Sequence, residues 1–198
     1  MITFDFNDGN GPVPAHQHSN GGGWVADTAT VKDTAYVGLN ARVYGNARVS
    51  DNARVCDTAR VSDHAWVSGD ALVSGDAEVF NYARVFNNAK VSDNAKVYGN
   101  AHVYGDAWVY GDAWVCSDAQ VCSDAQVFGK AMVYGKAMVS DNAEVYGNAL
   151  VSDHAWVSGN ALISGNAWVF DNAEVGDDVK EDMFIEMNGK RYKLVEIE

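Results

Sequence analysis

The sequence predicts an all-β protein that folds as a parallel β-solenoid, and three observations support this prediction. From Val25 to Val175 every sixth residue is Val, with Ile163 as the single exception, and no residue is inserted over these 26 positions. Ala occupies every sixth position from Ala29 to Ala173. The two positions after each Val-containing segment carry pairs such as Gly-Asn, Asp-Asn and Asp-His, which favour tight turns. A six-residue apolar period fits neither 3.6 nor 3.5 residues per turn, so a helix is excluded.

The repeating unit is Ala-x-Val-x-turn-turn, as in residues 47–52. Because Ala and Val lie two residues apart, they point to the same face of an extended segment, and the two x residues point to the other face. The unit therefore predicts a four-residue strand with two small inward side chains, followed by a corner.

Short strands joined by identical corners predict a stack of coils, because a single coil cannot bury its Val face alone. Three such units, one for each side, close a triangular coil. The repeat then forms about eight coils, and at ~4.8 Å per coil the rod is roughly 40 Å long. Each buried Val contributes roughly 1.5 to 3 kcal/mol, which is ample for independent folding.

The two ends of the chain depart from the repeat and predict a division into three parts. Residues 1–23 contain both prolines of the chain and are expected to form an irregular cap over the first coil. Residues 24–178 form the solenoid. In residues 179–198, two alternating segments flank Asn188-Gly189, which predicts a β-hairpin that serves in capping or oligomerisation.

Composition narrows the class of protein. The 198 residues are 47% hydrophobic and 21% charged, which is ordinary for a globular domain, and the net charge is -13. An acidic balance argues against binding to nucleic acid or to an anionic membrane. The first residues lack the pattern of a signal peptide, no long apolar stretch is present and there are only three cysteines, so we expect a cytoplasmic protein without disulfides.

The unit in residues 43–48, Val-Tyr-Gly-Asn-Ala-Arg, resembles the hexapeptide repeat of the left-handed parallel β-helix superfamily. Within that superfamily, residues 20–25 and the uninterrupted array are similar to uncharacterised proteins of tailed phages and prophages. The resemblance implies a single-stranded, left-handed, triangular β-helix, a homotrimer, and a place in the host cytoplasm if the chain is phage-encoded.

Outward residues that are three repeat units apart in the sequence lie on the same face, so each outward position can be assigned to one of three faces. The cations at these outward positions cluster in one part of the array. All seven cations that precede a core Val lie in the first half of the array, where they alternate with aromatic residues. Such a surface suits a small anionic, nucleotide-like ligand. The candidate ligand-binding residues are Arg42, Arg48, Arg54, Arg60, Arg84, Tyr44, Trp66, Tyr98, His102 and Tyr104. The alternative is that these cations pair with the corner acids Asp51, Asp57, Asp63, Asp70 and Asp76.

The second half of the array has apolar outward residues instead of cations. On one face they form a contiguous patch, and such a patch usually marks an interface. The candidate interface residues are Trp114, Met132, Tyr134, Leu150, Trp168 and Phe170. The alternative is that these side chains only stack along their own sheet.

Catalysis is not expected, although many superfamily members are acyltransferases that use a histidine base. The array has no excursion loop to shape an acyl-donor site. His64 and His154 lie five coils apart, or roughly 24 Å, and cannot act together. His102 is the one histidine on a face and has no positioned partner. Cys116 and Cys122 lie on different sides of the triangle, so neither a disulfide nor a metal site is expected.

The sequence thus predicts a non-catalytic, homotrimeric structural or binding module without cofactor or metal. One alternative is an acyltransferase with His102 near an intersubunit site. Another is a rod whose acidic corners mimic DNA and occupy a host protein. The segment His16-Gln17-His18 is interpreted as a loop, because no third metal ligand lies near it.

Overall fold

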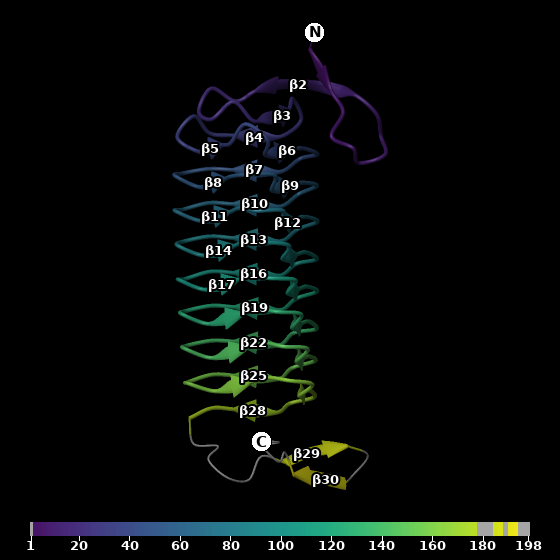
Figure 1. Cartoon of the computed structure of the whole chain (residues 1–198), viewed down its shortest axis with the longest axis vertical. Helices are drawn as coiled ribbons and strands as arrows, with labels where there is room; N and C mark the ends of the chain where they lie inside the picture. The colour runs from purple at the N-terminus through teal and green to yellow at the C-terminus, as the bar shows by residue number, and fades with distance from the viewer. Residues whose placement is uncertain (1, 178–183, 188–189, 194–198) are drawn as a thin grey trace.

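The computed structural model describes residues 2–177, 184–187 and 190–193, and most of this chain forms a parallel β-solenoid (Figure 1). Beyond β3 each coil adds one short strand to each of three sheets, which we call sheets 1, 2 and 3. Strands that are neighbours in a sheet are three repeat units apart in the chain, as in the pairing of Arg42 with Arg60. No helix occurs in the described ranges.

Each sheet runs along the rod. Sheet 1 contains β1 (Thr3–Phe4), β2 (Val13–Gln17), β3 (Trp24–Ala26), β6 (Arg42–Val43), β9 (Arg60–Val61), β12 (Glu78–Val79), β15 (Lys96–Val97), β18 (Trp114–Val115), β21 (Met132–Val133), β24 (Leu150–Val151) and β27 (Trp168–Val169). Sheet 2 contains β4 (Thr30–Val31), β7 (Arg48–Val49), β10 (Trp66–Val67), β13 (Arg84–Val85), β16 (His102–Val103), β19 (Gln120–Val121), β22 (Met138–Val139), β25 (Trp156–Val157) and β28 (Glu174–Val175). Sheet 3 contains β5 (Tyr36–Val37), β8 (Arg54–Val55), β11 (Leu72–Val73), β14 (Lys90–Val91), β17 (Trp108–Val109), β20 (Gln126–Val127), β23 (Glu144–Val145) and β26 (Leu162–Ile163).

The strands of the coils are shorter than the sequence predicts, although the hydrogen-bonded segment has the predicted length. Most of them span two residues rather than four. The Arg84 N–H donates to the Ala101 carbonyl at 2.9 Å, and the Phe86 N–H donates to the Val103 carbonyl at 3.0 Å. The bonded segment therefore covers all four residues from Ala to the residue after Val, and only its middle is regular strand.

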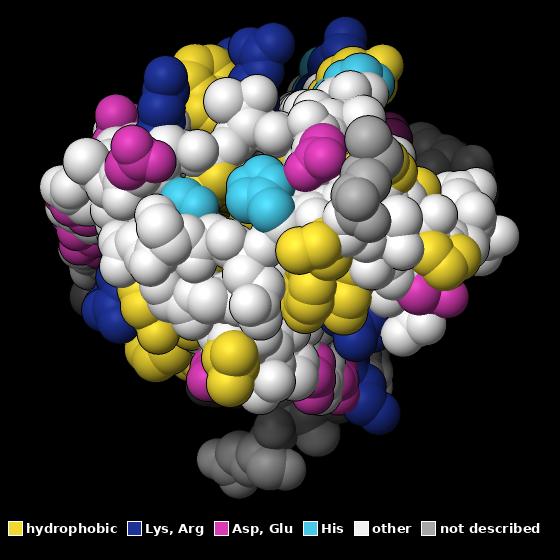
Figure 2. Space-filling view, turned by 90° about the horizontal axis from the view of Figure 1, so that it is seen from above, with side chains coloured by type: hydrophobic (Ala, Val, Ile, Leu, Met, Phe, Trp, Pro, Cys, Tyr) yellow, Lys and Arg dark blue, Asp and Glu magenta, His cyan; other side chains and the backbone are white. Residues whose placement is uncertain are grey.

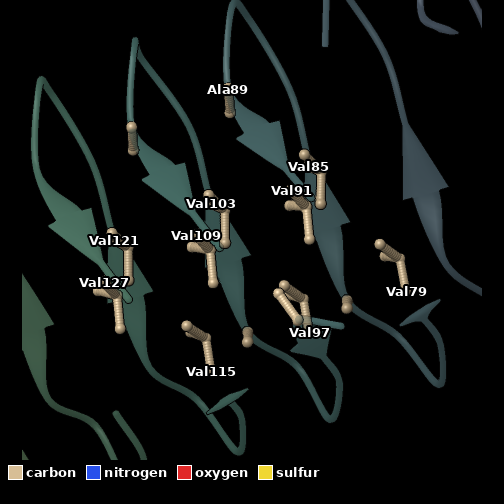
Figure 3. Packing of buried hydrophobic residues seen from close by; sticks show 14 of the residues in the cluster. Val79, Val85, Ala89, Val91, Val97, Val103, Val109, Val115, Val121 and Val127 are labelled. Carbon is tan, nitrogen blue, oxygen red and sulfur yellow. The ribbon is translucent and has the colours of Figure 1, made fainter. Parts of the chain in front are cut away.

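The core consists of Val and Ala alone over most of its length. Figure 3 shows Val85 and Val103, Val91 and Val109, and Val97 turned into the interior from the three sheets. These side chains have no solvent exposure. Every coil presents the same small side chains at the same places, so the coils stack without a change of register.

The corners depend on left-handed backbone at their first residue. From Gly45 to Asp171 every first corner residue has a φ between 54° and 74°. Gly adopts this conformation without strain, whereas Asp, Asn and Ser at the other corners do so at some cost. The corner aspartates gain a contact in return. A backbone N–H of the next coil donates to the carboxylate of each of six of them, at 2.9–3.4 Å: Asp51, Asp57, Asp63, Asp93, Asp141 and Asp153.

The N-terminal segment, predicted to be an irregular cap, contains two short strands, and residues 5–12 and 18–23 are irregular. Strand β1 pairs antiparallel with β2, and β2 pairs antiparallel with β3 of the first coil. The segment lies across the N-terminal end of the rod (Figure 1). His18 is buried and its Nε2 donates to the Ala35 carbonyl at 3.0 Å, while the Asn20 amide donates to the same carbonyl at 2.9 Å. These bonds satisfy an acceptor at the edge of sheet 3.

At the C-terminal end, β29 (Phe184–Met187) pairs antiparallel with β30 (Lys190–Lys193), as a hairpin requires. The predicted turn at Asn188-Gly189 lies outside the described residues.

The predicted all-β parallel solenoid of about eight coils is confirmed. Its left-handed winding, its triangular cross-section and the functional roles of the two ends stay predictions.

Candidate functional site

The candidate ligand-binding residues do not form one site, because the structure distributes them over three faces. Sheet 1 carries Arg42, Tyr44, Arg60 and Tyr98; sheet 2 carries Arg48, Trp66, Arg84, His102 and Tyr104; and sheet 3 carries Arg54. Of these residues, Arg42, Tyr44 and Arg60 lie together beside hollows of substantial size. Figure 2 looks onto the N-terminal end of the rod and shows Lys and Arg side chains projecting at its margin.

Two hollows lie on sheet 1 next to the N-terminal segment, and the side chains of Arg60 and Glu78 border both. The larger hollow, of about 590 Å³, is lined by Phe4, Trp24, Leu39, Asn40, Arg42, Thr58, Arg60, Asp76 and Glu78. The smaller hollow, of about 320 Å³, is lined by Asp8, Asn10, Tyr44, Arg60, Ser62, Asp63, Glu78 and Phe80. We call the larger hollow the N-terminal groove. Its volume lies in the range typical of small-molecule sites.

The N-terminal segment builds one wall of this groove, and sequence reasoning missed that role. The Arg42 Nη1 donates to the Phe6 carbonyl at 3.0 Å, and the Arg42 guanidinium lies 5.5 Å from the centre of the Phe4 ring. Phe4 in turn stacks on Trp24, with ring centres 4.4 Å apart. The alternation of apolar residues at positions 2, 4 and 6 was the available signal, since it is typical of a half-buried strand.

The interpretation that the face cations pair with corner acids is wrong for the described residues. The ion pairs of lysine and arginine in that part of the chain both involve Glu78 on sheet 1. Its Oε2 lies 3.1 Å from the Lys96 Nζ, and its Oε1 lies 3.7 Å from the Arg60 Nη1. Asp51, Asp57 and Asp63 instead accept backbone N–H groups of the next coil. Asp70 accepts the Asn52 side-chain amide, and Asp76 accepts the Thr58 hydroxyl.

Several cations stack on aromatic rings of a neighbouring coil. Arg54 lies 5.5 Å from the Tyr36 ring centre, and Arg84 lies 5.6 Å from that of Trp66. Trp66 and Arg84 also line a small hollow of about 200 Å³ with Ser68 and Phe86. Such contacts contribute about 0.5–1 kcal/mol at exposed sites, so these cations already have a structural role.

His102 lies on sheet 2 between Arg84 and Gln120. Burial, and then the positive charge of Arg84, lower its pKa below the usual 6.5. Tyr104, two residues on, stacks on Phe86 with ring centres 5.0 Å apart. Contact with the Cys122 thiol, followed by burial, raises the pKa of Tyr104 to about 12. The neutral form of the His102 imidazole is thus favoured. The charged neighbour with the largest effect on it, Arg84, is a cation and not an acid.

The candidate interface residues do lie on one face, the C-terminal half of sheet 1. Trp114, Met132, Leu150 and Trp168 occupy the same column in successive coils. Trp114 and Trp168 expose 38% and 54% of their surface. We call this set the apolar column. Tyr134 and Phe170 lie beside it, each two residues after a column member.

Aromatic stacking along the sheets is also present, but mostly in other columns. The rings of Tyr110, Phe128 and Tyr146 on sheet 3 stack with centres 4.8 and 4.9 Å apart, and those of Phe80 and Tyr98 on sheet 1 stack 4.9 Å apart. No such stack links the two exposed tryptophans of the apolar column in the described structure. Ladder packing therefore accounts for these stacked rings. In the apolar column, Trp114 has an edge contact with the Tyr98 ring and is still 38% exposed.

The remaining chemical candidates are not assembled into a site. His16 Nδ1 lies 2.9 Å from Asp27 Oδ1, and His18 is engaged by the Ala35 carbonyl. Within the described ranges, no group of three or more His, Cys, Asp or Glu side chains is placed to hold a metal ion. The same part of the chain contains no helix that could cross a membrane.

Comparison with known proteins gives one partial match. The family model described as the YdcK β-solenoid repeat matches residues 41–57, 95–111 and 143–159. The chain is therefore similar to this repeat over three separate windows, which agrees with the parallel solenoid of the structure. No curated protein and no solved structure matches the chain.

Proposed function

We propose that this chain is a non-catalytic, left-handed β-solenoid of the phage or prophage type that forms a homotrimer and serves as a structural and binding module. The subunits associate through the C-terminal halves of sheets 1 and 2. This leaves the cationic N-terminal half available to a partner or ligand. The observation that carries the proposal is the apolar column, a run of large apolar side chains on four successive coils of one sheet. Trp114 and Trp168 are exposed, and Met132 and Leu150 are half-buried.

A second apolar patch on sheet 2 favours three subunits over two. Met138 and Trp156 lie in neighbouring coils of sheet 2, and Trp156 is 45% exposed. These residues belong to the same coils as Met132 and Leu150 of the apolar column. A cyclic trimer needs two different complementary patches on each subunit, whereas a twofold dimer uses one patch twice. Sheet 1 of one subunit would then face sheet 2 of the next.

The absence of catalysis is proposed because the described coils run in constant register and His102, the histidine on a face of these coils, has no positioned acceptor. His16 lies 2.9 Å from Asp27 but belongs to β2, outside the coils. Consecutive strand pairs from β3 to β28 keep the same offset of three repeat units, which leaves no room for an inserted loop between described coils. An acyltransferase would need a base that is oriented by an acceptor, and the charged group with the largest effect on His102 is Arg84. Incubation with acetyl-CoA and candidate amine acceptors should release no free thiol above background.

Light scattering of matched variants tests the assembly. The wild-type chain should show three times the chain mass of 21.3 kDa. Trp168→Glu or Met132→Glu should give a folded protein of single-chain mass, because a buried, unpaired carboxylate opposes association. Leu162→Glu is the matched control, since Leu162 is 62% exposed on sheet 3 of a neighbouring turn and lies outside both patches. A trimer that survives both glutamates on sheet 1 would refute this interface.

A further inference from the structure

We propose that the N-terminal groove binds one oxyanion, the phosphate or carboxylate group of a small polar ligand, between the guanidinium groups of Arg42 and Arg60. The site lies at the opposite end of sheet 1 from the apolar column. It is formed within one chain, so it does not depend on the homotrimer.

Arg42 and Arg60 form a pair of like charges that is offset only by a long contact between Arg60 and Glu78. Seven outward cations directly precede a core Val, and Arg42 and Arg60 are the one pair of arginines among them that is separated by three repeat units. The structure places them directly opposite each other on β6 and β9. Like charges in directly opposite positions on neighbouring strands are destabilising. An anion that bridges the two guanidinium groups would remove this repulsion.

Both guanidinium groups keep donors that are not saturated, and the Arg42 group is already held in place. Arg42 uses Nη1 for the Phe6 carbonyl and lies against the Phe4 ring, so its position is fixed while other N–H donors stay available. Arg60 is 39% exposed, and its 3.7 Å separation from Glu78 is too long for a hydrogen bond. Glu78 has its closer contact with Lys96. Donors fixed before the ligand arrives cost less entropy on binding.

The other side chains that line the groove restrict the chemical class of the ligand. Asn40, Thr58 and Asp76 border the groove beside the arginines, and Trp24 supplies an apolar face. Carboxylate and amide oxygens at this place accept hydrogen bonds, so the ligand should carry hydroxyl or amine donors next to its oxyanion. Two acidic side chains in the lining also disfavour a polyanion such as a nucleic acid. The groove therefore fits a compact molecule with a single anionic group.

Arginine side-chain NMR tests the proposal with inorganic phosphate and acetate as separate probes. The chain has six arginines, so a protein labelled with ¹⁵N-arginine gives six Nε–Hε signals, assigned through single Arg→Lys variants. We expect saturable shifts of the Arg42 and Arg60 signals, with a dissociation constant of about 1–10 mM for the preferred probe. The tighter of the two probes identifies the group as phosphate or carboxylate.

Two variants and one control complete the design. Arg60→Gln should weaken the preferred probe at least tenfold at the Arg42 signal, and Arg42→Gln should do the same at the Arg60 signal. Arg48→Gln removes an exposed face cation outside the groove and should leave both shifts unchanged. All titrations are run at constant ionic strength with chloride, because general screening acts on every exposed arginine. Shifts that do not saturate, or that are equally large at Arg48, Arg54 and Arg84, would overturn the proposal.

Discussion

Removal of a single corner carboxylate should loosen the contact between two coils, and Asp63 is a suitable position. Its φ is 58°, and its Oδ2 accepts the Asn81 N–H of the next coil at 3.0 Å. Asp63→Gly removes this bond but also relieves the left-handed strain. Ser123→Gly is the matched control, because Ser123 has a φ of 59° and none of the hydrogen bonds found for the corner aspartates. The difference between the two variants isolates the carboxylate bond.

The free energy that the Asp63 hydrogen bond contributes can be worked out from similar hydrogen bonds in other proteins. A side-chain oxygen that accepts a backbone N–H at a helix N-cap stabilises by about 0.5–2 kcal/mol, and we expect about 1 kcal/mol here. Relief of left-handed strain and the greater freedom of unfolded Gly nearly cancel in each variant. Asp63→Gly should therefore lower the free energy of unfolding by about 1 kcal/mol more than Ser123→Gly.

Urea unfolding followed by circular dichroism measures this difference, and amide hydrogen exchange locates it. The Asn81 amide should exchange about fivefold faster in Asp63→Gly than in the wild type, which corresponds to about 1 kcal/mol. Equal stability of the two variants, with unchanged exchange at Asn81, would refute the idea that corner carboxylates join neighbouring coils.

Three further results are expected. Val103→Ala should lower the free energy of unfolding by about 2 kcal/mol in urea unfolding, because the Val103 side chain is fully buried and a cavity remains; a loss below about 0.5 kcal/mol would contradict the packed core. Burial, followed by contact with the Cys116 thiol, raises the pKa of Tyr98 from 10.0 to about 12, so ultraviolet titration should show that the Tyr98 phenol ionises above pH 10. The contribution of the neutral phenol to the stability of the fold should be complete below pH 10 and should be lost as the pH rises toward 12. The His102 imidazole should titrate by NMR with a pKa below 6.5, so its contribution to stability is present above pH 6.5 and is lost at lower pH. Arg84→Gln should raise this pKa, and an unchanged pKa would show that the charge of Arg84 does not act on His102.

The solenoid could be predicted because the residues that determine the fold recur at a fixed, short spacing along the sequence. Val at every sixth position and small residues between the corners leave one arrangement that buries every Val, and no insertion from Val25 to Val175 disturbs it. The strand pairs of the structure keep the predicted offset of three repeat units throughout the described coils. The same arithmetic placed the apolar column correctly on one sheet.

The groove could not be predicted from the repeat because it depends on a segment outside it. Phe4 and Phe6 reach Arg42 only because β2 turns back antiparallel onto β3, a pairing that periodicity does not specify. The pairing of cations with corner acids was wrong for a related reason. A corner aspartate such as Asp63 has a hydrogen-bond donor in the backbone of the next coil, the Asn81 N–H, which the spacing of the repeat does not specify.

Native mass spectrometry of the wild-type protein purified from its host tests the central claim most directly, namely that the exposed apolar column joins three copies of the rod. The account predicts one dominant species with three times the chain mass of 21.3 kDa. It also predicts that dilution does not readily release single chains. A dominant species of one or two chain masses would contradict the account.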